Sequence, residues 1–396
     1  MLHRWRAVAL VAFVACGLAA TPAAAQTDGS FPVRFTNETD GRWKDSQIFI
    51  TGIGQATPGR WSYLTADGKA APMDHTMAQA PGHLTKNGRN YANMSVSLAQ
   101  AEGMRIPPHF TGGRLYISVG EPMYFGLGDN DAPALPDLHS TTDPNSKTTF
   151  DWYELTYVFG QVHFGGNTTQ VDQFGLPLTA RVQQISTGFD ETRGITLSRK
   201  QVFERFEDSV SKPFRGLVEP DRILAPRTSP DFADNGKYGD YLDPVIDRAW
   251  DDWKDGFKLT RLGQTFTGEV RGGALRFKQD DKPREFAVRK PTSQDVFRCA
   301  GSLVIHGDDP VEEGVMGAEL CAAFNRGVAG DTDDWWKART YYPDGKRDND
   351  YAAFFHTINK ERKAYGFSYD DINDQSSVTI LRNSQPPTAL TIGVGW

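Results

Sequence analysis

The chain has 396 residues, of which 39% are hydrophobic and 23% charged, and its net charge is −7. This length and apolar content predict a folded protein of two domains and exclude a disordered chain. A negative net charge without a basic stripe argues against a nucleic-acid partner, because a phosphate backbone would be repelled. The 39 glycines and 23 prolines favour many short strands separated by turns.

The first 25 residues have the pattern of a secretory signal peptide. Arg4 and Arg6 precede an apolar stretch, and a cleavage site of small residues ends at Ala25. The stretch is too short for a stable membrane span, so we expect secretion into the periplasm or the medium. Lipoprotein processing at Cys16 is the alternative. Removing the leader takes away two arginines and no acidic residue, which lowers the net charge from −7 to −9.

Two cysteines, Cys299 and Cys321, remain after the leader. An even pair in an exported protein predicts one disulfide, which closes a loop of about 20 residues and stabilises the fold by roughly 3 kcal/mol. Two isolated cysteines are a poor metal site, and the histidines lack the spacing of a zinc hydrolase. The sequence therefore predicts no metal and no organic cofactor.

Residues 26–198 are predicted to form a β-sandwich or barrel. Apolar side chains alternate with polar ones at 31–35, and further strands are indicated at 48–50 and 114–119. Residues 126–147 are rich in Asp, Pro, Ser and Thr and are expected to form an exposed loop. Short strands at turn-punctuated intervals are typical of antiparallel sandwiches and barrels.

Residues 199–366 are predicted to form a mixed α/β domain, because the apolar period changes to that of helices. Helices are expected at 200–211, 243–253, 317–326 and 351–365, with a β-hairpin at 266–277 around Gly272 and Gly273. Residues 367–396 return to strands at 377–381 and 389–394. If these strands pair with the first sheet, the α/β domain is an insertion.

A candidate site lies on the predicted strand that includes residues 152–159. Alternation places Tyr153 and Leu155 on a core face and puts Trp152, Glu154 and Thr156 together on the other face. An indole can stack on a sugar ring while a carboxylate transfers protons. This face therefore suits a carbohydrate substrate.

A second carboxylate, Asp172, follows 18 residues after Glu154. A strand, a turn and a returning strand of that length bring the two acids near each other across a hairpin. Two carboxylates flanking a cleft are the minimum equipment for glycoside hydrolysis. The alternative is that both are surface acids or ion-pair partners, and the spacing alone favours that interpretation.

The motifs around both acids resemble those of glycoside hydrolase family 64, bacterial β-1,3-glucanases related to thaumatin-like proteins. The most specific block begins at Asn167 as Asn-Thr-Thr-Gln-Val-Asp and continues to Leu-Pro-Leu at Leu178. Glu154-Leu-Thr-Tyr precedes it. Supporting matches lie at 113–118, 322–326 and 365–371, in the same order along the chain.

The resemblance implies a mainly β fold: a thaumatin-like β domain with an inserted α/β domain and a wide groove between them. It assigns Glu154 as general acid and Asp172 as general base of an inverting mechanism. Inversion requires roughly 6.5–9.5 Å between the carboxyl groups, which leaves room for the attacking water. The expected partner is a β-1,3-glucan polysaccharide bound by a monomer.

The resemblance also suggests substrate-contacting residues, namely Trp152, Thr156, Phe164, Asn167, Thr169, Asp370 and Asp371. The family pattern has Trp and Asn near the places where this chain has Phe164 and Val158, which leaves the product length open. Further aromatic residues are candidates for stacking on glucose, although those at helical spacing are more typical of a core: Trp61, Tyr63, Trp250, Trp253, Trp335 and Trp336.

Two other functions remain alternatives at this point. The first is a non-catalytic, thaumatin-like glucan-binding protein whose cleft keeps its acids without activity. The second is hydrolysis of a different glycan. Assays on laminarin, with and without Glu154→Gln, separate these three possibilities.

Overall fold

The computed structural model describes residues 28–261, 263–280, 285–304 and 310–396. The predicted leader, with Arg4, Arg6 and Cys16, lies outside the described residues. In the described part of the chain, no helix has the length and apolar character needed to cross a membrane.

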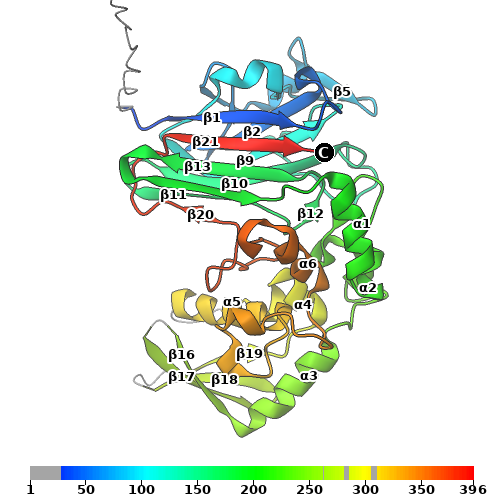
Figure 1. The fold of residues 1–396 in the computed structure, drawn as a ribbon, viewed down its shortest axis with the longest axis vertical. Coiled ribbons are helices and arrows are strands. Elements are labelled where there is room, and N and C mark those ends of the chain that lie inside the picture. The colour runs from blue at the N-terminus through cyan, green and yellow to red at the C-terminus, as the bar shows by residue number, and fades with distance from the viewer. Residues whose placement is uncertain (1–27, 262, 281–284, 305–309) are drawn as a thin grey trace, which may run out of the picture.

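Two sheets pack face to face in the upper part of the molecule (Figure 1). The first runs in the order β14 (Phe189–Gly194), β13 (Leu178–Gln184), β21 (Ala389–Gly395), β1 (Phe31–Glu38) and β8 (Arg105–Ile106). The second runs in the order β20 (Thr379–Ile380), β11 (Val162–Thr168), β10 (Thr149–Val158), β9 (His109–Val119), β2 (Ile48–Thr57), β3 (Arg60–Leu64) and β4 (Ala70–Pro72), and β7 (Val96–Ser97) pairs with β2. Among the described strands these sheets form a sandwich and not a closed barrel.

The core of the sandwich follows from strand alternation. Phe31 and Val33 of β1 are fully buried and belong to one cluster with Tyr153 and Leu155 of β10. Successive residues of a strand point to opposite faces, so the same alternation directs Glu154 away from this core. The opposite face of the second sheet is only partly covered, by a smaller aromatic and methionine cluster that includes Trp152.

The C-terminal strand completes the first sheet. β21 lies between β1, with which it is parallel, and β13, with which it is antiparallel. The strand predicted at 377–381 is shorter than expected. β20 contains two residues and, among the described strands, pairs with Gly165 and Gly166 at the edge of the other sheet.

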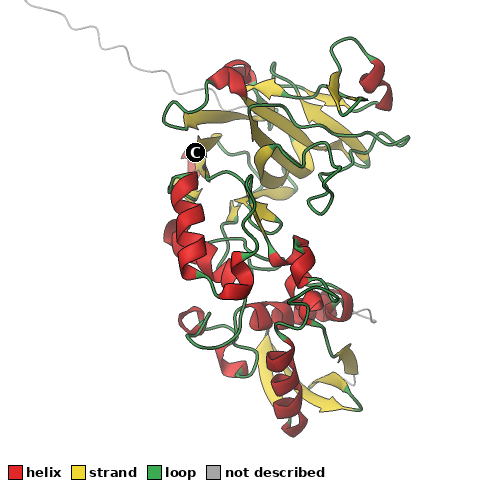
Figure 2. Cartoon of the chain, turned by 90° about the vertical axis from the view of Figure 1, so that its right-hand side faces the viewer, coloured by secondary structure: helices red, strands yellow, loops and turns green. Residues whose placement is uncertain are grey.

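Below the sandwich lies a part rich in helices, with a four-stranded antiparallel sheet at its far end (Figures 1 and 2). The sheet contains β16 (Phe257–Arg261), β17 (Gln264–Arg271), β18 (Ala274–Gln279) and β19 (Glu285–Arg289), and β17 and β18 form the expected hairpin. The helices are α1 (Arg199–Ser209), α2 (Lys212–Arg215), α3 (Asp243–Asp252), α4 (Ser293–Arg298), α5 (Pro310–Asn325) and α6 (Asp350–Ile358). Two further two-stranded sheets lie outside this part's main sheet. β5 (Leu84–Lys86) pairs with β6 (Arg89–Tyr91) in the upper part of the molecule, and β12 (Gln173–Phe174) pairs with β15 (Ile223–Leu224).

The helix boundaries have local causes. Ser198 caps α1 through a capping box with Gln201, and Val202 and Phe206 face the core one turn apart. The helix expected over 351–365 ends early, at Ile358, because Asn359 adopts an extended backbone and its side chain bonds the Phe355 carbonyl. α5 begins earlier than expected, at Pro310, where proline favours a helix start.

The predicted disulfide between Cys299 and Cys321 is confirmed, with 5.5 Å between the two Cα atoms. Cys299 caps α4 in the left-handed conformation, and Cys321 lies in α5. The bond therefore fixes the end of α4, where Arg298 is located, to the longest helix of the lower part.

Candidate functional site

An open trench crosses the outer face of the eight-stranded sheet. It consists of two adjoining cavities of about 400 and 480 Å³, both lined by Arg114 and Leu135. The first cavity also contains Trp152 and Asp172, and the second contains Glu154. The two predicted acids therefore line one continuous depression.

Glu154 occupies the centre of three paired strands. It lies directly opposite Arg114 of β9 on one side and opposite Asn167 of β11 on the other. Directly paired residues share a face of the sheet, so all three side chains face the trench. Both ladders shift register just beyond this position, between Leu155 and Tyr157 on the β9 side and between Thr156 and Val158 on the β11 side, and such irregularities redirect side chains next to sites.

One oxygen of the Glu154 carboxylate has two donors. The Trp152 indole Nε1 donates to Oε1 over 3.0 Å, and Arg114 Nε lies 3.3 Å from the same oxygen. Among the described residues, none donates a hydrogen bond to Oε2. The carboxylate is thus oriented through one oxygen while the other is left for a ligand.

The backbone at Asp172 is tied to the residue that follows β15 and to the 3₁₀ turn after it. Ala225 N–H and the Thr228 hydroxyl both donate to the Asp172 carbonyl, over 3.0 and 2.7 Å. The next residues are tied to β10, because the buried Asp151 carboxylate accepts the N–H of Gly175. A Cβ on Gly175 would lie 2.0 Å from a β10 carbonyl oxygen, so only glycine permits this approach.

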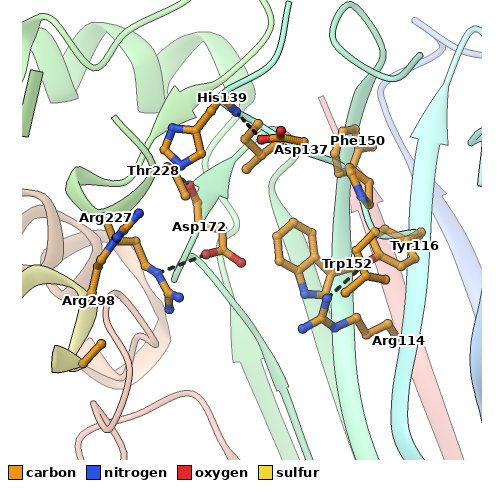
Figure 3. A pocket seen from close by; sticks show the side chains of 14 residues that line it. Arg114, Tyr116, Asp137, His139, Phe150, Trp152, Asp172, Arg227, Thr228 and Arg298 are labelled. Atoms are coloured by element: carbon orange, nitrogen blue, oxygen red, sulfur yellow. Dashed lines mark hydrogen bonds and ion pairs between the residues drawn. The ribbon is translucent and has the colours of Figure 1, made fainter. Parts of the chain in front are cut away.

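The Asp172 carboxylate is half-buried and pairs with Arg227, whose Nε lies 3.3 Å from Oδ1. Figure 3 shows Asp172 between Arg227 and Trp152, with Arg298 on the Arg227 side and Arg114 below the indole. Among the described residues, none donates a hydrogen bond to Asp172 Oδ2. Asp172 thus repeats the arrangement of Glu154, with one oxygen held by an arginine.

Glu154 and Asp172 both raise the pKa values of Arg114 and Tyr116. Burial alone would lower the pKa of Arg114, but Tyr116, Glu154 and Asp172 together raise it above its ordinary value. Burial raises the pKa of Tyr116 to about 12, and Glu154 and Asp172 contribute in the same direction while Arg114 opposes them. Arg114 donates to the Tyr116 hydroxyl over 3.3 Å. A guanidinium therefore lies within the field of both carboxylates.

The remaining predicted substrate residues divide into two groups. Trp152, Thr156 and Asn167 line the trench. Asn167 is buried, and its Nδ2 has no hydrogen-bond partner among the described residues. A buried donor without a protein partner is costly unless a ligand or water bonds it.

The second group requires correction. Phe164 is fully buried and packs edge-to-face on Phe31, since it has the opposite parity to Asn167 along β11. Thr169 is buried, and its hydroxyl accepts the Val171 N–H. Asp370 is fully buried and bonds Arg326 and His356. None of the three side chains reaches the trench.

Asp371 is exposed, but it lines neither cavity of the trench. The tryptophans considered as sugar platforms are also mostly structural: Trp250, Trp253 and Trp335 are buried in the core of the lower part. Trp336 is partly buried there and donates to Glu319. Trp61 lines the trench, whereas Tyr63 packs beside the aromatic cluster without lining it.

Sequence reasoning missed the arginines of the site. Arg114 lies in a matched family segment, and the alternation of Arg114 and Tyr116 with buried neighbours could have placed it on the Glu154 face. Arg227 and Arg298 lie in a 3₁₀ turn and at a helix end. No local pattern indicates that either side chain reaches the trench.

A larger cavity, of about 1210 Å³, lies between α6, the end of α1 and residues 338–350. It contains neither Glu154 nor Asp172. The chemistry predicted from the sequence therefore belongs to the smaller trench on the sheet.

Solved structures with the same fold are β-1,3-glucanases. A β-1,3-glucanase domain from Clostridium beijerinckii is 30% identical with a TM-score of 0.86, and the match covers 95% of this chain and all of that one. A laminaripentaose-producing β-1,3-glucanase from Paenibacillus barengoltzii, crystallised with laminarihexaose, is 30% identical with a TM-score of 0.74. That match covers 94% of this chain and 76% of the other.

Curated relatives carry the name glucan endo-1,3-beta-glucosidase. The protein from Arthrobacter sp. (strain YCWD3) is 28% identical over 303 residues, and the one from Cellulosimicrobium cellulans is 27% identical. Each alignment covers 72% of this chain and 53% of the relative, so the chain spans about half the length of these proteins. The family described as beta-1,3-glucanase matches residues 29–394, and the chain therefore belongs to glycoside hydrolase family 64.

Proposed function

We propose that this protein is an exported enzyme that hydrolyses β-1,3-glucan with inversion, using Glu154 as general acid and Asp172 as general base. The observation that best supports this is the paired arrangement of the two acids in one trench. Each carboxylate has one oxygen beside an arginine and a second oxygen that accepts no hydrogen bond from the described residues. The predicted leader and the Cys299–Cys321 disulfide support export.

In this mechanism the free oxygens perform the chemistry. Asp172 Oδ2 accepts a proton from a water molecule, and the water oxygen forms a bond to the anomeric carbon. Glu154 Oε2 gives its proton to the glycosidic oxygen as the carbon–oxygen bond breaks. The products are two shorter glucans, the first with inverted anomeric configuration, and the two carboxyl groups exchange protonation states.

Substrate binding is assigned to the trench face of the sheet. Asn167 Nδ2 is placed to donate to a sugar hydroxyl, which would satisfy its unpaired N–H. Trp61 lies in the same cavity as Glu154 and offers a partly exposed ring for stacking on a pyranose.

The test is turnover of laminarin by the parent and by two variants. Glu154→Gln and Asp172→Asn are each expected to lower kcat by at least 1000-fold while laminarin binding persists, because both keep the side-chain shape and lose the proton chemistry. Glu285→Gln is the matched control, since its carboxylate pairs with Arg271 and Arg276 on the distant sheet. NMR of the first product then checks inversion directly.

One observation favours the non-catalytic alternative. Both acids contact arginines, as structural ion-pair partners do. A parent protein that binds laminarin but releases no oligosaccharides would support that alternative. Turnover of another polysaccharide, with laminarin untouched, would keep the catalytic pair and change the substrate.

A further inference from the structure

We infer that Arg227 is a positioning residue that sets the orientation of the Asp172 carboxylate, and that this control reaches Asp172 from the C-terminal segment through Ser368. The inference rests on the proposed function, because it concerns the residue assigned as general base. The backbone of Asp172 is held by several partners, whereas its carboxylate depends on Arg227.

The backbone of Asp172 is held by several bonds that do not involve Arg227. Its carbonyl accepts from Ala225 N–H and Thr228 Oγ1. On either side, Tyr351 donates to the Gln170 carbonyl, and the Gln173 amide donates to a β10 carbonyl. The peptide at this position is therefore fixed whatever side chain stands at 227.

The side chain has one anchor only. Among the described residues, Arg227 is the single partner of the Asp172 carboxylate, at 3.3 Å from Nε to Oδ1. Without it the carboxylate is free to turn about its side-chain bonds. A base that turns away from the attack position loses rate even when its charge and its backbone are unchanged.

Arg227 is itself held at its other end. Its Nη1 donates to Ser368 Oγ over 2.8 Å, and Ser368 lies in the segment between α6 and β20. The guanidinium thus bridges two segments 141 residues apart in sequence. Because it is planar, with Nε and Nη1 at fixed angles, a bond at Nη1 sets the direction in which Nε points.

Lysine at this position keeps the charge but not the geometry. A single ammonium nitrogen cannot reproduce two contacts made from fixed positions in a rigid plane, the Nη1 hydrogen bond to Ser368 and the Nε contact with Asp172. If Arg227 serves only as a counter-charge, lysine should replace it. If it sets an orientation, lysine should recover a part of the activity only.

The experiment is steady-state kinetics of the full chain on laminarin. Arg227→Ala is expected to lower kcat roughly 10- to 100-fold with KM within about threefold of the parent. Millimolar guanidinium, too dilute to denature the protein, is expected to restore part of kcat in this variant and to leave the parent unchanged. The kcat of Arg227→Lys is expected to lie between those of the parent and Arg227→Ala.

Arg181→Ala is the matched control, because Arg181 also pairs with an aspartate, Asp190, outside the trench. It should leave kcat, KM and guanidinium response unchanged. Ser368→Ala removes only the second anchor and should lower kcat about threefold with parental thermal stability. If Arg227→Ala does not fold, Ser368→Ala and Arg227→Lys carry the test.

Three results overturn the inference. One is an Arg227→Ala variant that keeps parental kcat, and another is a kcat loss that matches the loss of folded protein and is not rescued by guanidinium. The third, which applies if the alanine variant does not fold, is parental kcat in both Ser368→Ala and Arg227→Lys. Asp172→Asn separates the two proposals. If this variant stays active, the assignment of Asp172 as the base is wrong. If it is inactive while Arg227→Ala keeps full activity, only the positioning role of Arg227 is wrong.

Discussion

The two walls of the trench are built in different ways. On the sheet wall, Glu154, Arg114 and Asn167 are placed by strand register alone. On the opposite wall, Arg227 and Arg298 come from a 3₁₀ turn and a helix end that are held by contacts distant in sequence. The sheet wall should therefore tolerate substitutions without moving, while the opposite wall should respond to changes made far from the trench.

The opposite wall depends on a buried cluster of charges. Asp370 accepts from Arg326 Nη2 at 3.2 Å and faces His356 Nε2 at 2.9 Å. It also accepts the Gly366 N–H, in the segment that carries Ser368. The cluster thus shapes the chain that anchors Arg227.

The largest expected effect follows from breaking this cluster. Asp370→Asn leaves Arg326 and His356 buried without a counter-charge, and removing one partner of a buried ion pair costs about 3–5 kcal/mol. Urea unfolding should show this loss, together with a lower kcat in the fraction that remains folded. Asp374→Asn is the control, since Asp374 is exposed and its one ion pair within the described ranges is with Lys363. Equal stability of the two variants would contradict this account of the opposite wall.

A smaller effect concerns the charge of His356. Its Nδ1 lies 2.8 Å from the Arg362 carbonyl and its Nε2 faces Asp370, so both nitrogens meet acceptors. Burial works to lower the pKa of His356, but the Asp370 carboxylate outweighs it and raises the pKa above its ordinary value. The stabilisation is complete below about pH 6.5 and is lost as pH rises through the folded-state pKa.

The corresponding measurement is the free energy of unfolding between pH 5 and pH 9. The parent should lose stability as pH rises over the upper part of this range. His356→Gln should be less stable at the acidic end and should show a shallower decline than the parent. Some decline should remain because burial raises the pKa of Asp151 to about 7 and that of Asp348 to about 8, and both acids contribute to the decline in either protein. A parent curve that rises toward pH 9 would mean that His356 is neutral in the fold.

The same contrast explains what the sequence could predict. Alternation alone placed Glu154 and Trp152 on the open face of β10, and residues 31–35 and 389–394 on strands, because side-chain direction in a strand is a local property. Helix starts were predicted at Asp243, where proline follows, and at Lys200, one residue after the observed start of α1. These elements are determined by their own residues.

What failed depends on contacts distant in sequence. Asp370 was assigned to the groove only by resemblance to the family, yet its carboxylate meets Arg326, directly after α5, and His356 of α6. Arg227 reaches Asp172 only because β15 pairs with β12. Phe164 was wrongly assigned to the trench. The pairing of β11 with β10 puts Asn167 on the trench face, and Phe164, three residues earlier, therefore faces the core.

An intermediate effect tests the Phe164 correction. Phe164→Trp adds volume to a fully buried position beside Phe31 and should destabilise the fold by about 1–3 kcal/mol. Because the side chain faces the core, the sizes of the laminarin products should not change. Phe35→Trp, at a partly exposed position on β1, should cost less. Altered product sizes in Phe164→Trp would return this position to the trench.

The smallest expected effect isolates one hydrogen bond on the sheet wall. Trp152→Phe keeps an aromatic ring in the cluster but removes the indole N–H that donates to Glu154 Oε1. Arg114 still contacts that oxygen, so the carboxylate keeps one of its two donors. We expect kcat to fall about tenfold, which corresponds to about 1.4 kcal/mol, with only a small change in KM.

Trp43→Phe is the matched control for this variant, because the Trp43 indole nitrogen is buried without a hydrogen-bond partner in the described part of the chain and its ring packs on Trp396. Both substitutions remove the same atoms and a similar apolar volume, so a comparable loss of stability is expected from each. Only Trp152→Phe should lower kcat, since only that indole bonds the proposed acid. If both variants keep parental kcat, strand register and Arg114 orient Glu154 without the indole. The sheet wall would then hold Glu154 in place without this hydrogen bond, whereas the opposite wall depends on the side-chain contacts of Arg227.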